Sequence, residues 1–368
     1  MKNRICHISS VHPRYDSRIF QKQCIGLSQN GYQTFLIVAD GKEDEVKEGV
    51  HILNAANGAQ LKSKLKRILH IPRLIEQKIL KMKPDLVHLH DPELIPLGLR
   101  LKLKGFIVVA DFHEDIPLQI ITKPYLNSIL KRIVSFTFKI YQRYASKKMS
   151  AIVSATPTIA ETLMKYNPIN VVVKNYPRVD TTISKNETKK NWITYIGGIN
   201  RIRGFFEIIE AAKESNTQLK IAGIFHEPIL HDVIKKDEYS LNVDFLGFLN
   251  KAQVGELLNE SIAGLVTLHP TKNFLDSLPI KLFEYMSAGI PVIASNFPLW
   301  KTIVEGNECG ICVDPTDPSQ IAEAMTFLKE NPEEAKKMGD NGRKAVLEKY
   351  NWKSEEKKLI DLYNTLLS

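Results

Sequence analysis

The 368-residue chain is poor in the features that mark disulfide-rich and membrane-spanning proteins. It has four cysteines and no run of 18 or more apolar residues, so the sequence offers no candidate membrane span. Its first residues enter a strand-like segment directly and lack the long apolar region of a secretion signal. With 43% hydrophobic and 25% charged residues, the composition is that of a globular protein, which we expect to be cytoplasmic.

The cysteines give little support to a metal or redox centre. Cys309 and Cys312 form a C-x-x-C pair, but no second pair of cysteines or histidines lies near it to complete four zinc ligands. A redox pair would normally open a helix, whereas this one runs into the apolar residues 311–313. A metal or redox function stays open as the alternative, and the sequence favours small buried residues at the edge of a strand.

Acidic residues are scarce in the first half of the chain. Residues 1–180 contain 28 Lys and Arg against 15 Asp and Glu, whereas the remainder contains 22 and 26. Residues 116–160 hold no acidic residue at all. This asymmetry predicts that the first half faces an anionic partner, and nucleic acid and an anionic membrane both fit the charge.

Short apolar segments alternate with helical stretches twice along the chain, which predicts an α/β fold with two parallel sheets. The first set comprises strands 5–9, 34–39, 86–90, 107–111 and 151–154, with helices 18–30, 65–82 and 126–148. The second set comprises strands 192–196, 219–222, 243–246, 264–268 and 291–294, with helices 205–214, 251–260, 280–287 and 318–331. We therefore expect domains at 1–177 and 178–351, the second opening with a linker at 178–191, and a terminal helix at 352–368. Doubly wound domains bind ligands at the carboxyl ends of their strands, so the site is expected in the cleft between the two.

The most specific segment is 276–295, in which two carboxylates lie eight positions apart. Asp276 precedes an expected helix that starts near a proline, and Glu284 lies one turn inside it. The free amides of Ile280 and Lys281 would point at an anion, assisted by the helix dipole. A diphosphate at the helix tip would leave each carboxylate able to accept hydrogen bonds from hydroxyl groups. The alternative is an N-capped amphipathic helix with Glu284 on its solvated face.

A second segment, residues 195–204, ends an expected strand in a loop that carries two arginines. Guanidinium groups bind phosphate through two parallel hydrogen bonds and offset the charge of a leaving group. Arg201 and Arg203 are therefore candidate ligands for a diphosphate. The alternative is that both are solvated loop cations.

Polar residues follow two expected strands of the first half. His113 comes directly after strand 107–111, and this position at the carboxyl end of a strand favours a functional side chain. The next two residues, Glu114 and Asp115, either share that function or cap the following segment. A similar stretch is expected mainly to organise the loop below the site: His88, His90 and Asp91.

These segments resemble the motifs of glycosyltransferase family 4, a retaining family of GT-B fold with two Rossmann-like, doubly wound domains facing each other across a cleft. Segment 276–295 resembles the family's E-x7-E signature, and the resemblance gives Asp276 the contact with the donor sugar and Glu284 that with the ribose. The chain departs from the signature in having Asp at the first position, which bears on the identity of the sugar.

The resemblance assigns roles to the other segments as well. Residues 195–204 resemble the family's strand and loop that bring cations to the donor diphosphate. Arg203 stands at the usual basic position, whereas the earlier basic position is occupied by Gly198, for which Arg201 would substitute. Residues 108–117 resemble the family's HEDxP stretch, which gives His113 a contact with the transferred sugar.

The turn at residues 9–18 lacks the glycines of most family members, but it resembles a branch with a proline and a D-x-R sequence. Four polar residues of this turn are expected to bind acceptor or donor phosphate: His12, Arg14, Asp16 and Arg18. The alternative is a local ion pair between Asp16 and Arg18.

The resemblance implies transfer of a sugar from a nucleotide-sugar, held by the second domain, to an acceptor held by the first, with retention of configuration. No D-x-D metal motif is present, and Arg203, Lys281 and the amides at 280–281 would stabilise the leaving diphosphate, so we expect neither metal nor cofactor. We hypothesise front-face substitution, in which the leaving phosphate accepts the proton of the acceptor. The segment expected to set the choice of nucleotide base includes Phe248 and Leu249.

Two basic stretches, 62–83 and 116–160, bear on the acceptor. Basic amphipathic helices lie on anionic lipid, which would suit a polyprenyl-linked saccharide acceptor. We therefore expect peripheral attachment to the inner face of the cell membrane and a role in surface polysaccharide assembly, such as O-antigen or capsule. The alternative is that the apolar faces of these helices are core and the cations are simply solvated.

Three other functions remain to be weighed against this one. A nucleotide-sugar 2-epimerase of the same fold would need its own acidic base constellation, which is not seen. A nucleic-acid-binding module would explain the basic half but leaves segment 276–295 unexplained, and no known motif of that class is present. An inactive nucleotide-sugar-binding protein stays open, because Asp276 and Gly198 depart from the family pattern.

Overall fold

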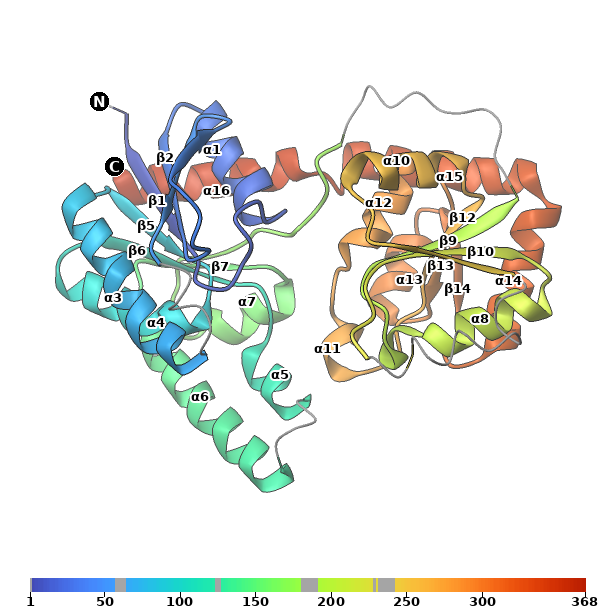
Figure 1. Ribbon diagram of the computed structural model, residues 1–368, viewed down its shortest axis with the longest axis horizontal. Helices are drawn as coiled ribbons and strands as arrows, with labels where there is room; N and C mark the ends of the chain where they lie inside the picture. Colours follow the sequence, from blue (N-terminus) through green and yellow to red (C-terminus); the bar gives the residue numbers. More distant parts are fainter. Residues whose placement is uncertain (1, 57–63, 123–126, 180–190, 228–229, 231–241) are drawn as a thin grey trace. The chain divides into compact units, whose positions relative to one another are not determined.

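The chain forms two α/β units in a computed structural model that describes residues 2–56, 64–122, 127–179, 191–227, 230 and 242–368 (Figure 1). One unit comprises Met1–Asn175 with Trp352–Ser368, and the other comprises Tyr176–Asn351. The first boundary thus lies at Asn175, where the sequence predicted 177. The last helix is grouped with the first unit.

An eight-stranded sheet in the order β3-β4-β2-β1-β5-β6-β7-β8 forms the centre of the first unit, as far as the chain is described. All neighbours are parallel except β3 and β4. The strands are β1 (Arg4–Ile8), β2 (Gln33–Val38), β3 (Glu45–Lys47), β4 (Val50–Asn54), β5 (Leu86–Leu89), β6 (Ile107–Phe112), β7 (Ala151–Ser154) and β8 (Asn170–Val172). Its helices are a π-helical turn η1 (Ile19–Cys24), α1 (Ile25–Gln29), α3 (Lys64–Met82), the short η2 (Pro92–Leu94), α4 (Ile95–Leu103), α5 (Ile116–Thr122), α6 (Ser128–Lys148), α7 (Pro157–Met164) and α16 (Trp352–Leu367).

Alternation along the strands sends side chains to two different cores. In β1, Cys6 and Ile8 join the core that contains Ile71, Ile75 and Ile79 of α3, whereas Ile5 joins the core that contains α16. The apolar face of α3 therefore belongs to the core. This agrees with the alternative to lipid binding that was considered for the basic stretch 62–83. From α16 the second core takes Trp352, Leu359, Leu362 and Tyr363.

The second unit has a six-stranded parallel sheet in the order β11-β10-β9-β12-β13-β14. Its strands are β9 (Trp192–Ile196), β10 (Gln218–Ala222), β11 (Val243–Gly247), β12 (Ala263–Val266), β13 (Val292–Ser295) and β14 (Gly310–Val313). Its helices are η3 (Arg201–Arg203), α8 (Phe205–Glu214), α10 (Lys251–Glu260), α11 (Lys272–Leu275), α12 (Ile280–Ala288), α13 (Pro298–Val304), α14 (Pro318–Glu330) and α15 (Pro332–Glu348).

The cysteine pair lies at the edge strand β14 of this sheet. Cys309 is buried and Cys312 is half-buried, and both are free thiols. The interpretation of the pair as small residues at the edge of a strand is confirmed. No helix in the described part of the chain combines the length and the apolarity needed to cross a membrane.

Candidate functional site

The loop after β9 turns where two backbones come very close together. Gly197 has φ of 132°, a conformation that L side chains rarely adopt. At Gly223, a Cβ atom would lie 1.8 Å from the carbonyl oxygen of Gly197. The turn can therefore form only with glycine at these positions, and it brings the end of β9 next to the end of β10.

Arg203 and Lys281 carry buried donors at this turn. The Nη1 of Arg203 donates to the carbonyl of Gly198 at 3.4 Å, while its Nε is buried without a hydrogen-bond partner. The residue Lys281 is half-buried, but its Nζ is fully buried, has no hydrogen-bond partner and lies 3.8 Å from the ring centre of Tyr195. Burial and then the charge of Arg203 hold the pKa of Lys281 well below its usual range. The arrangement is one that an anion would stabilise.

Arg201 lies in the same short helix, η3, but its charge is already paired. Its Nε lies 3.4 Å from Oε2 of Glu227, and its guanidinium lies over the ring of Phe206 at 5.0 Å. Both members of the ion pair are exposed on their side chains. Arg203 therefore fits the expected diphosphate contact better than Arg201.

The two carboxylates of segment 276–295 sit on either side of the start of α12. Asp276 is exposed at the end of α11, and Glu284 is half-buried inside α12. Trp300 fixes the connection by donating from Nε1 to the carbonyl of Ser277 at 2.8 Å. The amide of Leu282 donates to the carbonyl of Pro279 at 3.1 Å. Because α12 begins after Pro279 without a side-chain cap, the amides of Ile280 and Lys281 are left for another acceptor.

His226 is a candidate that the sequence did not single out. A Cβ atom at Gly198 would lie 2.3 Å from Nε2 of His226 and 3.0 Å from Nη1 of Arg203. The imidazole thus occupies the space beside Arg203 that a side chain at position 198 would need. An isolated loop histidine gives no signal in the sequence, so only the fold brings it here. Beyond β11, Phe248 is 76% exposed and Leu249 is half-buried.

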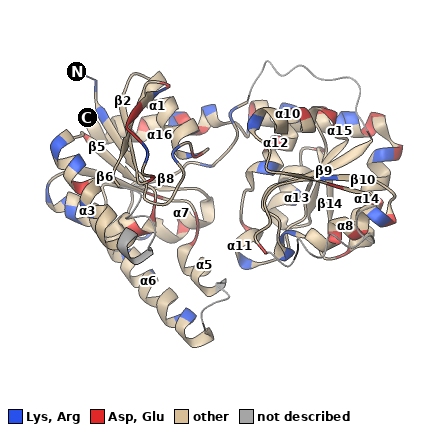
Figure 2. Cartoon of the chain, in the orientation of Figure 1, with Lys and Arg blue, Asp and Glu red and all other residues tan. Residues whose placement is uncertain are grey.

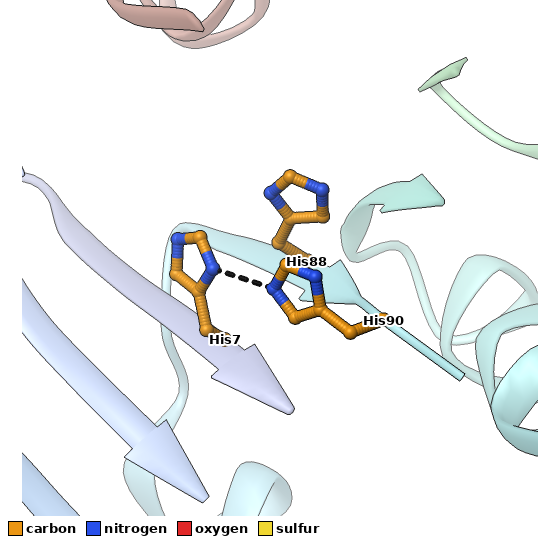
Figure 3. A group of neighbouring side chains, drawn as sticks. All are labelled: His7, His88 and His90. Atoms are coloured by element: carbon orange, nitrogen blue, oxygen red, sulfur yellow. Dashed lines mark hydrogen bonds between the residues drawn. The ribbon is translucent and has the colours of Figure 1, made fainter. Parts of the chain in front are cut away.

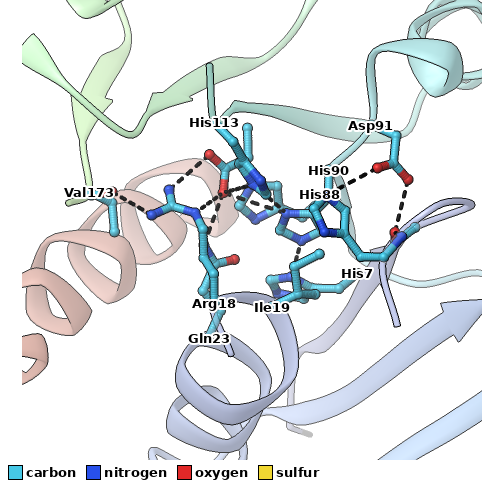
Figure 4. Close-up of polar contacts among 12 residues, drawn as sticks. His7, Arg18, Ile19, Gln23, His88, His90, Asp91, His113 and Val173 are labelled. Atoms are coloured by element: carbon cyan, nitrogen blue, oxygen red, sulfur yellow. Dashed lines mark hydrogen bonds and ion pairs between the residues drawn. The ribbon is translucent and has the colours of Figure 1, made fainter. Parts of the chain in front are cut away.

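In the first unit, Asp111 is the centre of a buried polar network. Figure 4 shows its partners Arg18, Gln23 and His113. Its Oδ1 pairs with Nη2 of Arg18 at 2.9 Å, and its Oδ2 accepts from Nε2 of Gln23 at 2.9 Å. Nε2 of His113 lies 3.2 Å from the same Oδ2. Burial opposes ionisation of Asp111, but Arg18 and His113 outweigh it and hold the pKa of this carboxyl well below its usual range.

Three histidines, His7, His88 and His90, continue this network (Figure 3). Tyr363 of α16 bonds to two of them. His7 on β1 and His88 on β5 are partners in the sheet register. Nδ1 of His7 is 2.8 Å from Nε2 of His90, and the hydroxyl of Tyr363 bonds to both His7 and His88. Burial lowers the pKa of His90 to about 3 and lowers those of His7 and His88 well below their usual range. These rings are therefore neutral at neutral pH.

The turn at residues 9–18 is held by carboxylates. Arg14 is buried and paired with Asp40 and Glu45, at 2.7 Å in each case. Arg18 pairs with Asp111, so the local ion pair with Asp16 considered from the sequence is wrong. Both guanidinium groups are thus neutralised within the protein, which favours structural roles in place of the predicted phosphate contacts.

His12 and Asp16 are the more accessible members of this turn. Nδ1 of His12 is 3.6 Å from Asp16, and its Nε2 is 3.3 Å from Asp91. The hydrogen bond with Asp16 raises the pKa of His12 above its usual value. Asp91 also accepts from the backbone of Ser10 at 2.6 Å, which is the loop-organising role expected for it. Two predicted acceptor contacts, His12 and Asp16, remain in reach of a ligand.

The side chains after His113 behave as caps. Asp115 accepts the amide of Leu118 at 3.0 Å in the first turn of α5, and Glu114 accepts from Gln119. His113 itself has 19% of its side chain exposed, and it also lies 3.3 Å from Nδ1 of His90. Asp111 and His90 hold His113 from one side and leave the other side of the ring accessible.

Within the described part of the chain, two groups of side chains in the first unit have ligand atoms within 4.8 Å of one another: His7, His88 and His90, and His90, Asp111 and His113. In the first group, His7 bonds to His90, and the hydroxyl of Tyr363 bonds to His7 and His88. In the second, the carboxylate is already bound by Arg18 and Gln23. Nε2 of His88 is buried without a hydrogen-bond partner, and the absence of a metal requirement stays a prediction.

Comparison with known families assigns both halves of the chain. The model described as glycosyl transferases group 1 matches residues 179–345, and that described as Glycosyltransferase Family 4 matches residues 18–177. O-antigen chain mannosyltransferase C from Escherichia coli is 22% identical over 308 residues, covering 79% of this chain and 78% of that protein. Sucrose synthase 2 from Pisum sativum is 26% identical over 197 residues, but the matched part is only 23% of its length.

Solved structures share the fold over nearly the whole chain. Sucrose-phosphate synthase from Thermosynechococcus elongatus has a TM-score of 0.76 at 15% identity and covers 99% of both chains. HepE from Anabaena in complex with UDP and glucose has a TM-score of 0.75 at 11% identity, with 99% of this chain and all of that chain covered. WaaG, a glycosyltransferase involved in lipopolysaccharide biosynthesis, has a TM-score of 0.69 at 14% identity, covering 96% and 98%.

The fold is therefore that of the GT-B glycosyltransferases, as the sequence predicted. Within this class, the chain belongs to the group 1, family 4 glycosyltransferases, whose two models together account for most of its length.

Proposed function

We propose that the protein is a retaining glycosyltransferase that transfers a sugar from a nucleotide-sugar to a saccharide acceptor. One observation carries the proposal: Nε of Arg203 and Nζ of Lys281 are buried without hydrogen-bond partners, beside the glycine turn of β9. A buried donor without an acceptor costs about 1–3 kcal/mol. The diphosphate of a bound donor would supply acceptors to both groups and to the free amides at the start of α12.

The same groups would act on the leaving diphosphate. As the bond between the anomeric carbon and the phosphate oxygen breaks, negative charge grows on the diphosphate, and Arg203, Lys281 and the helix amides stabilise it. The acceptor hydroxyl forms the new bond on the same face, and its proton passes to the leaving phosphate oxygen. This step needs neither a metal nor a nucleophilic side chain of the protein.

The remaining donor contacts follow from the family. Asp276 would bind hydroxyl groups of the sugar, and Glu284 those of the ribose. The exposed ring of Phe248 is placed to stack on a nucleotide base. His113 would contact the transferred sugar through the accessible side of its ring, and we expect His113→Ala to lower kcat while nucleotide binding stays unchanged.

We further propose a lipid-linked saccharide acceptor and a role in surface polysaccharide assembly on the cytoplasmic side of the membrane. Support comes from the names of two similar proteins, an O-antigen chain mannosyltransferase and a glycosyltransferase involved in lipopolysaccharide biosynthesis. The acceptor would meet the accessible polar residues of the first unit, His12 and Asp16.

The test begins with a thermal-shift screen of the full chain against UDP, GDP, ADP, CMP and their sugar conjugates in the presence of a chelator. We expect one nucleotide to stabilise the protein and Glu284→Ala to abolish the shift. Incubation of that nucleotide-sugar with saccharide acceptors should then give a product of retained anomeric configuration. Conversion of the donor without an acceptor would indicate an epimerase instead, and binding without turnover would indicate an inactive binding protein.

A further inference from the structure

Helix α6 turns its apolar stripe away from the protein. Its buried residues are small or polar: Ser135, Gln142, Ala145 and Ser146. Its exposed residues include Ile129, Ile133, Phe136, Ile140 and Tyr144. Because these five follow one another at intervals of three or four residues, they form a single stripe along one face of the helix. The alternative in which the apolar face of this stretch is core is therefore wrong for this stripe, although Phe138 and Tyr141 of α6 pack against the core of the first unit.

The stripe is large enough to indicate a binding surface. Phe136 is 65% exposed and Ile129 is 72% exposed, although large apolar side chains on a helix of a globular protein normally face its core. The amino-terminal part of α6 extends away from the sheet of the first unit, with α5 beside it (Figure 1). On α5, Ile121 is exposed as well.

Cations border the stripe, and no acidic residue offsets them. Arg132, Lys139 and Arg143 follow at intervals of seven and four residues and so form a row beside the apolar stripe. Lys147 and Lys148 close its carboxyl end. Along α6, Figure 2 shows segments in the colour of Lys and Arg and none in the colour of Asp and Glu. Long basic side chains bury their stems along an apolar surface and keep their charge at the phosphate level, as in interfacial helices.

We propose that α6 is the membrane-docking element of this protein and lies in the interface of an anionic lipid bilayer, with its stripe among the acyl chains. A polyanion such as nucleic acid would engage the cations but leave the stripe exposed to water. A second copy docked on the same face would bring the cations of one helix near those of the other, without carboxylates to pair them. Only a surface that is both anionic and apolar matches the two rows together.

The inference does not depend on transfer activity, because it is tested with lipid alone. Full-length protein is sedimented with vesicles of phosphatidylcholine, or of phosphatidylcholine and phosphatidylglycerol in a 3:1 ratio. We expect binding to the anionic vesicles, at least about tenfold weaker for Phe136→Gln with Ile140→Gln, since two apolar side chains are removed from the interface. Leu103→Gln changes an apolar residue that is 89% exposed on α4 and should leave binding unchanged.

The row of cations beside the stripe is tested with separate variants. Arg132→Gln and Lys139→Gln should each weaken binding to the anionic vesicles about fivefold and reduce its sensitivity to salt, whereas Lys165→Gln, on the exposed surface after α7, should not. Sedimentation velocity of the same variants tests whether a second copy of this chain binds to the face of α6 instead. Failure of the wild type to bind anionic vesicles at low salt, equal binding by the stripe variant, or a dimer that the stripe variant dissociates would each overturn the proposal.

Discussion

Asp111 and Arg18 form a buried ion pair that joins strand β6 to the start of η1, the first helical turn of the chain. Oδ1 of the carboxylate lies 2.9 Å from Nη2 of the guanidinium, and less than a twentieth of either side chain is exposed. The same carboxylate orients His113, the predicted sugar contact. The stability of the first unit and the geometry of the predicted sugar-binding histidine are thus linked through one residue.

Asp111→Asn is therefore expected to cost about 3–5 kcal/mol of unfolding free energy, because it leaves the charge of Arg18 buried and uncompensated. Urea unfolding measures the loss. Glu76→Gln is the matched control, since its partner Arg100 is 41% exposed, and it should cost about 1 kcal/mol or less. Similar costs for the two variants would contradict the central role of Asp111.

The buried histidines predict that the protein loses stability in mild acid. Burial lowers the pKa values of His7, His88 and His90, so these rings stay neutral when folded but take up protons near pH 6.5 when unfolded. Stability is then fully present above about pH 6.5 and falls as the pH drops below this value, by roughly 1.4 kcal/mol per pH unit for each ring. Urea unfolding at several pH values should show a shallower slope for His88→Gln. The exposed His70→Gln should keep the slope of the wild type, and a slope unchanged in both variants would refute this account.

Much of the fold follows from local sequence. Strands 151–154 and 192–196 have the predicted bounds, because each is a short apolar run flanked by polar residues. The polar strand β3 was missed, since an exposed edge strand buries too little to leave an apolar pattern. Edge strands of this kind are identified only once their partner is known.

The candidate site, like the fold, was predicted only in part from the sequence. The sequence predicted the local positions of its candidate residues: His113 follows strand β6, Arg203 lies in the connection after β9, and Asp276 precedes helix α12. The sequence could not show that Arg18 crosses to Asp111, 93 positions away, because that contact depends on sheet register. Nor could the period of α6 show which face is buried, since periodicity reports a stripe and not its direction.

Lys281 predicts that nucleotide binding is coupled to proton uptake. Burial and Arg203 lower its pKa in the free protein, and a bound diphosphate would raise it again. Between the two pKa values the protein takes up a proton on binding, so affinity should fall as the pH rises from the pKa of the free protein to that of the complex. Calorimetric titrations in buffers of different ionisation enthalpy measure this uptake. Lys281→Met should abolish it, Lys344→Met should not, and uptake that persists in Lys281→Met would assign the proton elsewhere.

His226 is expected to contribute to the same anion site. His226→Ala should weaken nucleoside diphosphate binding at least about tenfold, in line with the loss of one hydrogen bond to a charged group. Gly198→Ala should have a similar effect, because the added methyl group displaces the imidazole and Arg203. Equilibrium titration gives both values, with the exposed His70→Ala as the control. Full affinity in His226→Ala would remove this residue from the site.

The central claim is that Arg203, and not its neighbour Arg201, binds the donor diphosphate. Its most direct test is the dissociation constant of the nucleoside diphosphate found by the screen, measured by calorimetry for the wild type and for the two alanine variants. The account predicts binding at least about a hundredfold weaker for Arg203→Ala, since a charged hydrogen-bonding group is lost, and within about threefold of the wild type for Arg201→Ala. Equal losses in the two variants, or a loss confined to Arg201→Ala, would contradict it.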